Sequence, residues 1–76
     1  MHLAAKKGHL KTMEVLISSG ADLYAQDFWN WTPLHYASFN KHKEAVQLLC
    51  YADSDREDLR LVRNSQGKLA KDMSNS

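Results

Sequence analysis

The sequence predicts an all-α protein in which helix–turn–helix units stack side by side as a solenoid. The first observation is an internal repeat, because His2 and His9 return 33 positions later as His35 and His42. A period of this length is typical of repeat proteins whose units cannot bury their apolar faces alone. The second observation is that apolar residues in both repeats follow the spacing of one helical face. Together they indicate a core between neighbouring units.

The first repeat is expected to contain two helices and a connecting segment. Residues 3–7 form the end of a first helix, and residues 10–18 form a second helix. The second helix has apolar residues at positions i, i+3 and i+4, namely Met13, Leu16 and Ile17. Gly20 is expected to end it, because glycine readily adopts the left-handed conformation found after helix C-termini.

A connecting finger is expected at residues 21–30, between the first and the second repeat. Thr32 is placed to cap the next helix, and Pro33 to occupy its first position, where a missing amide hydrogen costs nothing. This helix is expected to run to Asn40. A further helix is expected at residues 43–52. Its apolar stripe corresponds in position to the stripe of the first repeat and consists of Ala45, Val46, Leu48 and Leu49.

A third, shorter unit is expected to begin at residue 64, after an insertion of four residues within 53–61. The acidic residues 53–58 are expected to stay exposed without packing. Apolar and basic residues alternate at 59–62, which is typical of a short extended finger. Residues 74–76 are expected to fray.

Motif residues of the second repeat occur in a distinctive order: Gly20-Ala21-Asp22, Asp27, Asn30, Thr32-Pro33-Leu34-His35 and Ala37. They resemble the ankyrin repeat, whose unit is a β-turn or hairpin finger followed by two antiparallel helices. The resemblance covers residues 1–52 well. It implies one domain or fragment, residues 1–76, made of a repeat without its first finger (1–26), a full repeat with an acidic insertion (27–63) and a truncated capping repeat (64–76). We expect a piece of a longer array, the alternative being a short protein with an unusual N-terminal cap.

Composition and charge narrow the classes of partner and the location. The net charge of +1 argues against bulk nucleic acid as a partner. No apolar run is long enough to insert into a membrane, and the N-terminus lacks the apolar stretch of a signal peptide. The single cysteine cannot form an internal disulfide. These features predict an intracellular protein of the cytoplasm or nucleus.

Metal binding and catalysis are the less favoured interpretations of the histidines and the cysteine. The resemblance implies that His2 and His35 support neighbouring fingers by hydrogen bonds. Cys50 has no partner thiol for zinc and is expected to be a small buried apolar residue. The chain has no glycine-rich phosphate loop, nucleophile elbow or catalytic carboxylate pair. We therefore expect no metal, no cofactor and no enzymatic activity.

Large aromatic residues gather in the finger of the second repeat. The resemblance implies that finger tips and the facing surface of the first helix form a concave binding face. The positions that match this face are Phe28, Trp29, Trp31, Phe39 and Asn40, with Lys6, Lys7 and Gln26 beside them and Ser65, Gln66 and Lys68 in the third unit. The sequence therefore predicts an aromatic surface with polar to basic edges.

This surface predicts a non-catalytic scaffold or adaptor that binds a protein or peptide with an apolar anchor and some acidic character. At least one of Trp29 and Trp31 is expected to contact the partner, with Trp29 the first candidate. One alternative is a regulatory or targeting segment of a larger intracellular enzyme or channel. Another is a purely architectural role, in which the rings pack on neighbouring fingers or on the helix layer. Exposed repeat ends also favour self-association.

Overall fold

The computed structural model describes residues 1–54 and 58–73. Its elements in chain order are α1 (His2–Lys7), α2 (Leu10–Ser18), α3 (Pro33–Phe39), α4 (Lys43–Ala52), the 3₁₀ helix η1 (Leu59–Leu61) and α5 (Ala70–Met73). These ranges contain helices and no strand, so the predicted all-α fold is confirmed. In the same ranges, no helix has the combined length and apolarity needed to cross a membrane. The fraying predicted at 74–76 lies outside the described residues.

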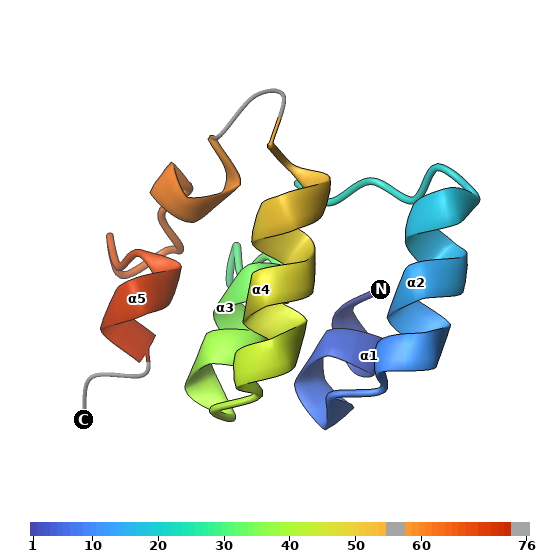
Figure 1. Cartoon of the computed structure of the whole chain (residues 1–76). Helices are drawn as coiled ribbons and strands as arrows, with labels where there is room; N and C mark the ends of the chain where they lie inside the picture. Colours follow the sequence, from blue (N-terminus) through green and yellow to red (C-terminus); the bar gives the residue numbers. More distant parts are fainter. Residues whose placement is uncertain (55–57, 74–76) are drawn as a thin grey trace.

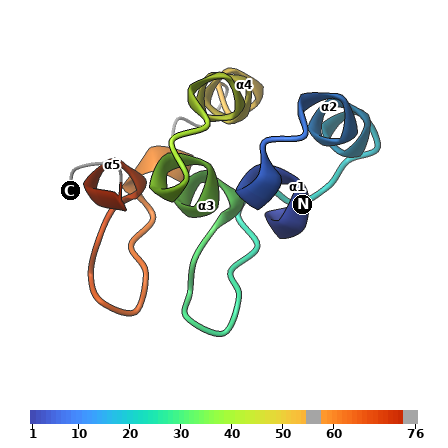
Figure 2. The same cartoon turned by 90° about the horizontal axis from the view of Figure 1, so that it is seen from below.

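The helices form two layers (Figure 1). In the inner layer, α3 lies between α1 and α5 and packs against both. In the outer layer, α2 packs against α4. Figure 2 shows two fingers, one before α3 and one before α5, extending from the inner layer away from α2 and α4. The arrangement is a short solenoid, in which each layer is built from equivalent helices of successive units.

Thr32 fixes the start of α3 through a reciprocal capping box with His35. The His35 amide donates to Thr32 Oγ1 (3.3 Å), and the Thr32 amide donates to His35 Nδ1 (3.1 Å). Pro33 occupies the first helical position, where no intrahelical donor is required. Since Thr32 and His35 are completely buried, these bonds satisfy polar groups that water cannot reach. The predicted cap is confirmed.

The helices α1, α2 and α3 end in the same hydrogen-bonded motif. After α2, the amides of Gly20 and Ala21 donate to carbonyl oxygens of the last turn, each at 3.0 Å. This Schellman pattern requires a left-handed residue, and Gly20 has a φ of 87°. Gly8 (φ 70°) and Lys41 (φ 60°) occupy the corresponding positions after α1 and α3. The sharp turn they produce brings each outer helix back onto its inner helix.

The core consists of small and medium apolar side chains between neighbouring helices. Its buried members are Ala4, Ala5, Met13, Leu34, Ala37, Ala45, Leu49, Leu59 and Ala70. Alanine at Ala5 and Ala37 leaves no bulk between the inner helices, so their backbones approach closely. Met13 and Leu49 are completely buried on the facing sides of α2 and α4. The predicted apolar stripe between repeats is therefore confirmed.

The segment after α4 differs from its prediction at Asp53 and at residues 59–62. Asp53 is buried instead of exposed, and Leu59–Leu61 form the 3₁₀ helix η1 instead of an extended finger. The Asp53 carboxylate accepts hydrogen bonds from Tyr24 Oη and from the Leu59 amide (2.8 Å). Leu59 itself is 1% exposed and joins the core. The exposure prediction was wrong because an acidic residue can be buried when its oxygens accept hydrogen bonds. The prediction of an extended finger was wrong because Leu59 packs in the core and its amide bonds Asp53, within a 3₁₀ turn. Residues 55–57 lie outside the described ranges.

Cys50 also differs from its prediction, because it is exposed rather than buried. Leu49, the preceding residue, faces the core and is fully buried. One position further along a helix is turned by about 100°, and this rotation carries Cys50 to a side of α4 that faces a groove.

We predict that Gly8→Ala destabilises the protein more than Gly20→Ala. Both glycines have positive φ, so alanine is strained at either position. A Cβ at Gly8 would lie 2.8 Å from two atoms of the His42 ring, whereas at Gly20 nothing lies within 4 Å. The His42 ring is also held in place, because its Nε2 hydrogen-bonds the Lys6 carbonyl at 2.9 Å.

Urea unfolding followed by circular dichroism measures the difference. Gly20→Ala should lose about 1–2 kcal/mol for the left-handed backbone, and Gly8→Ala about 1–3 kcal/mol more for the clash. Equal losses at the two positions would contradict the close approach of the His42 ring.

Candidate functional site

The Asp27 carboxylate organises the finger between α2 and α3. Its Oδ1 accepts hydrogen bonds from the amides of Trp29 (3.0 Å) and Trp31 (2.9 Å), and its Oδ2 accepts one from Tyr36 Oη. The Asn30 amide closes the turn by donating to the Asp27 carbonyl (2.9 Å). Asn30 has a φ of 62°, which asparagine tolerates better than most residues. These bonds fix the backbone that carries both tryptophans.

The same hydrogen bonds determine the pKa values of Asp27 and Tyr36. Burial alone would raise the pKa of Asp27, but hydrogen bonds from Tyr36 and from the amides of Trp31 and Trp29 outweigh it and hold the pKa below its ordinary value. Burial, the hydrogen bond to Asp27 and the charge of Asp27 raise the pKa of Tyr36 to about 12. At neutral pH, Asp27 is therefore a charged acceptor and Tyr36 a neutral donor.

The finger before α5 repeats this arrangement with an amide in place of the carboxylate. Asn64 Oδ1 accepts hydrogen bonds from the amides of Gln66 (2.9 Å) and Lys68 (3.0 Å). Gly67 takes the place of Asn30, with a φ of 75° and an amide that donates to the Asn64 carbonyl (2.9 Å). The two fingers therefore have the same backbone conformation. The repeat limits at 1–26, 27–63 and 64–76 stay predictions.

Two histidines connect the inner helices to the fingers. His2 Nε2 hydrogen-bonds the Trp31 carbonyl, and His35 Nε2 hydrogen-bonds the Lys68 carbonyl, both at 2.9 Å. Since a carbonyl oxygen can only accept, each Nε2 carries a proton. At His35 the other ring nitrogen accepts from the Thr32 amide, so one neutral tautomer satisfies the ring. The support of fingers that the resemblance implies for His2 and His35 is confirmed.

Trp31 folds back onto the inner helix layer. Its ring is half-buried and lies 4.8 Å from the Tyr36 ring and 5.4 Å from the Phe39 ring, centroid to centroid. Aromatic pairs at these separations stabilise each other beyond the area they bury. Trp31 thus has a structural role, as the architectural interpretation expects for one of the two tryptophans.

Trp29, in contrast, presents its ring to solvent. The side chain is 61% exposed, and Phe28 beside it at the finger tip is 90% exposed. The Phe28 and Trp29 rings meet edge to face, with centroids 5.7 Å apart. Both rings are therefore accessible on a finger whose backbone is fixed.

A cavity of about 380 Å³ opens between the two fingers and the inner helices. It is lined by Lys6, Trp29, Trp31, Tyr36, Phe39, Asn40, Ser65 and Gln66. Seven of these were predicted for the concave face from their positions in the sequence. Tyr36 was missed, although it lies three residues before Phe39 and so shares its helical face. The cavity is therefore the centre of the predicted surface.

Four predicted residues lie outside this cavity: Phe28, Lys7, Gln26 and Lys68. Gln26 Nε2 donates to the carbonyls of Asn30 (2.9 Å) and Arg63 (3.4 Å), so it links the two fingers. Phe28 and Lys7 are exposed beyond the cavity's edge. Contacts of a partner with these residues stay predictions.

The cavity combines apolar walls with hydrogen-bond donors. Its walls are aromatic rings, and Lys6 and Gln66 contribute an ammonium and a side-chain amide as donors, whereas Asn40 uses both of its amide hydrogens on the Lys6 and Tyr36 carbonyls. Asn40 Nδ2 donates to the Lys6 carbonyl (3.1 Å), which holds this edge in place. Among the described residues, no acidic side chain lines the cavity. Such a site suits an apolar side chain that is followed by a carboxylate or another acceptor.

Comparison with known proteins identifies several relatives. A family model described as "Ankyrin repeats (many copies)" matches residues 1–49. The chain is similar to protein phosphatase 1 regulatory subunit 12A of Mus musculus, with 36% identity over 62 residues, 82% of this chain and 6% of that protein. It is similar to protein phosphatase 1 regulatory subunit 27 of Mus musculus, with 30% identity over 73 residues, 96% of this chain and 45% of that protein.

A further relative is transient receptor potential cation channel subfamily A member 1 of Homo sapiens. The identity is 39% over 49 residues, which cover 64% of this chain and 4% of the channel. The chain thus spans less than half the length of each of these three relatives.

We predict that Asp27→Ala lowers the free energy of unfolding at neutral pH by about 1–3 kcal/mol, because two amides and one hydroxyl lose their acceptor. Asp27→Asn is the matched control, since Asn64 accepts the same two amide bonds in the other finger. It should lose less than Asp27→Ala in urea unfolding. Equal losses would contradict the role of Oδ1 as an amide acceptor.

A second prediction concerns the stability of the protein at low pH. Because the folded-state pKa of Asp27 lies below its unfolded value, its charge stabilises the folded protein above about pH 4. This contribution is lost as the pH falls from there through the folded-state pKa. Asp27→Asn should therefore show a shallower loss of stability than the wild type as urea unfolding is repeated at decreasing pH. Parallel curves would contradict it.

Proposed function

This chain belongs to the ankyrin-repeat family, and from that premise we propose that it is a non-catalytic module that binds a protein or peptide across its fingers. Ankyrin repeats are protein-interaction modules, and two of the relatives are named as regulatory subunits of an enzyme. The fold alone does not determine the partner. The proposal therefore depends on the cavity between the fingers.

The observation that supports the proposal most is the exposed Trp29 ring on a fixed backbone. The Trp29 amide donates to Asp27 Oδ1 (3.0 Å), and its carbonyl accepts from the Ser65 amide (3.0 Å). Both sides of this peptide are thus fixed before a partner arrives. A large ring held in this way loses little conformational entropy on binding, and tryptophan is enriched among residues that dominate binding energy.

The lining of the cavity indicates the chemistry of the partner. A volume of about 380 Å³ admits one or two apolar side chains, and the aromatic walls favour such an anchor. Lys6 at the edge favours an acidic group beside the anchor and disfavours a cationic one. We therefore propose a peptide segment with an apolar anchor and an adjacent carboxylate.

One alternative function is a regulatory or targeting segment of a larger protein. It is supported by relatives that are regulatory subunits of a phosphatase and by one that is a cation channel. The other alternative, purely architectural repeats, explains the packing of Trp31 on Tyr36 and Phe39. It does not explain why Trp29 stays exposed beside a cavity.

The test compares Trp29→Ala with Phe28→Ala. Both remove an exposed ring from the same finger, but only Trp29 lines the cavity. Trp31 is left intact because its half-buried ring packs on α3. The three proteins are immobilised and exposed to cell lysate, with purified protein phosphatase 1 catalytic subunit as the first defined partner.

A partner held through the cavity should bind Trp29→Ala at least about tenfold more weakly, as expected for a hot-spot residue. Phe28→Ala should have a clearly smaller effect, because the Phe28 ring contacts Trp29 but does not line the cavity. Circular dichroism confirms that both variants fold. If Trp29→Ala retains every partner at wild-type affinity, the cavity is not the binding site and the architectural alternative is favoured.

A further inference from the structure

Five exposed lysines follow one edge of the molecule, where each inner helix turns back into its outer helix. They are Lys6, Lys7, Lys11, Lys41 and Lys43, and we call them the basic edge. In Figure 1 the turns after α1 and after α3 lie on one edge, and the connections that follow α2 and α4 lie on the opposite edge. Half of the ten Lys and Arg residues thus gather at two turns, although the net charge of the chain is only +1.

The two turns are held together, and a hollow lies beside their contact. The Lys6 carbonyl accepts hydrogen bonds from Asn40 Nδ2 (3.1 Å) and from His42 Nε2 (2.9 Å). The His42 ring lies so close to Gly8 that a Cβ there would come within 2.8 Å of it. The hollow has a volume of about 310 Å³ and is lined by Gly8, Leu10, Lys41, His42, Lys43, Glu44 and Ala45. The basic edge therefore has a fixed backbone and a concave centre.

None of these five lysines forms an ion pair within the residues that the structure describes. The acidic residues nearest to them along the chain are Glu14, one turn after Lys11, and Glu44 in the hollow. The other acidic residues of the described ranges follow α2 or α4 or belong to the finger and α5: Asp22, Asp27, Asp53, Asp58 and Asp72. The positive charge of the edge is therefore left for a partner to neutralise.

The fold itself does not favour lysine at three of these positions. Lys11 and Lys43 lie in the first turns of α2 and α4, where the helix dipole favours acidic residues. Lys41 has a φ of 60°, and glycine stands at the equivalent position of the first repeat. The dipole favours only Lys6 and Lys7, in the last turn of α1. Residues that oppose the stability of the fold in this way point to a role in binding.

Stacking of repeats leaves the first turn open. The second repeat packs on the first, yet Lys6, Lys7 and Lys11 are exposed beside it. In the second repeat, Phe39 and Glu44 are the equivalents of Lys6 and Lys11, and they are exposed with the first repeat before them. Side chains at these positions therefore stay accessible between two neighbouring units.

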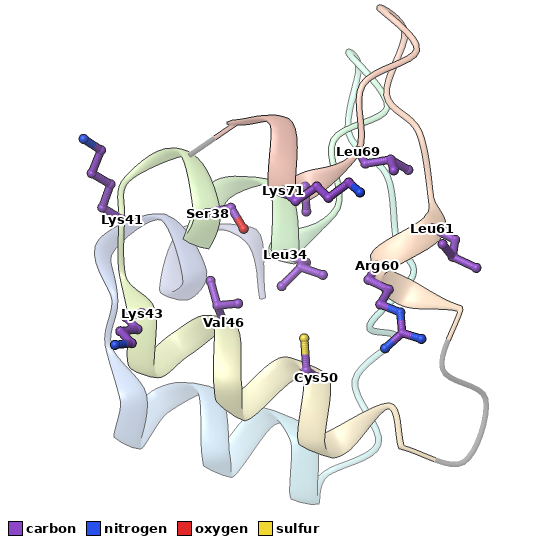
Figure 3. Close-up of a pocket in the computed structure, with 11 residues that line it drawn as sticks. Leu34, Ser38, Lys41, Lys43, Val46, Cys50, Arg60, Leu61, Leu69 and Lys71 are labelled. Carbon is purple, nitrogen blue, oxygen red and sulfur yellow. The ribbon is translucent and has the colours of Figure 1, made fainter. Parts of the chain in front are cut away.

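The second turn lies nearer to the end of the stack. Figure 3 shows Lys41 and Lys43 at one end of the wider groove between α4, α3, η1 and α5. Their equivalents in the first repeat, Gly8 and Leu10, are half-buried under the second repeat. A following unit would thus cover part of Lys41 and Lys43 and leave the first turn unchanged. The lysines of the first turn therefore decide whether the edge is a surface of its own.

We propose that the basic edge binds an acidic segment of a protein partner, which crosses both turns and enters the hollow. A nucleic acid carries a charge at every phosphate and would meet Glu44, whereas a peptide can place a neutral residue there. A bilayer also attracts lysines, but stable attachment requires a second signal such as an apolar anchor. The exposed large apolar side chains lie outside residues 6–11 and 40–44. This surface shares only Lys6 with the cavity between the fingers.

The probe is a fluorescein-labelled peptide of about six consecutive glutamates, and the control peptide has glutamines in their place. Fluorescence anisotropy should show binding of the acidic peptide alone, about fivefold or more weakly at about 200 mM than at about 50 mM salt, because salt screens exposed charges. In heteronuclear NMR spectra, the amide signals of residues 6–11 and 41–45 should shift and those of residues 28–31 should not. No binding, equal binding of both peptides, or shifts confined to other residues would overturn the proposal.

Charge reversal on each turn is the second measurement. Lys7→Glu combined with Lys11→Glu, and Lys41→Glu combined with Lys43→Glu, should each weaken the acidic peptide about fivefold or more. Lys6 is left intact because it also lines the cavity between the fingers. An effect of the second turn alone would place the peptide on the end of the stack and overturn the proposal.

Arg60→Glu combined with Lys68→Glu is the matched control. It changes the net charge by the same amount at exposed positions outside both turns, and it should weaken the peptide less than about twofold. Equal weakening by the control would reduce the effect to net charge and overturn the proposal. Circular dichroism confirms that the variants fold, and the NMR shifts of the wild type test the location without any variant.

Other occupants are tested with the same protein. Tighter binding to phosphatidylcholine vesicles with 20% phosphatidylserine, or to a short DNA duplex, than to the acidic peptide would overturn the proposal. A dimer in sedimentation that dissociates at high salt and competes with the peptide would assign the edge to a second copy of the chain and also overturn it. Trp29→Ala should leave peptide binding unchanged, because Trp29 does not line the hollow, so this result is independent of binding at the fingers.

Discussion

The hydrogen bond from an inner-helix histidine to the next finger is the interaction on which the rest of the structure depends. His2 reaches the Trp31 carbonyl and His35 reaches the Lys68 carbonyl, each across about thirty positions of sequence. A finger has no core of its own, so its backbone depends on this bond together with the Tyr36–Asp27 hydrogen bond and the bonds between the two fingers. At His35 the same ring also caps α3 through Thr32, so one buried side chain fixes a helix start and a finger.

This bond explains why the two tryptophans of one finger have different roles. The Trp31 carbonyl accepts from His2, and its ring is thereby placed against Tyr36 and Phe39. With Trp31 held, the Asp27 turn directs Trp29 outward, where its carbonyl meets the Ser65 amide of the next finger. Trp29 is therefore exposed because the hydrogen bonds of Asp27 and Trp31 fix the finger with the Trp29 ring outside. A rigid, exposed ring is what a binding surface requires.

The sequence predicts most of the fold because its signals are local and repeated. Residues 10–18 and 43–52 were predicted as helices with the bounds that the structure has, since apolar spacing and flanking turns agree there. The burial of Asp53 was not predicted because its hydrogen-bond partners are distant in sequence: Tyr24 lies about one repeat earlier, and Leu59 follows after a turn. Seven cavity residues followed from repeat positions, but the half-burial of Trp31 depends on ring packing in three dimensions, which no sequence pattern records.

The cavity between the fingers and the wider groove, which lies between α4, α3, η1 and α5, meet at α3, so their independence depends on whether this helix can shift. α3 presents Tyr36 and Phe39 to the cavity and Leu34 and Ser38 to the groove. Coupling between two sites requires an element with two arrangements that both ligands bias differently. α3 is packed by α1 on one side and α5 on the other, with Ala37 completely buried between them, and its start is fixed by the Thr32 capping box. A helix restrained on both sides and at its start resists the displacement that coupling between its two faces would require.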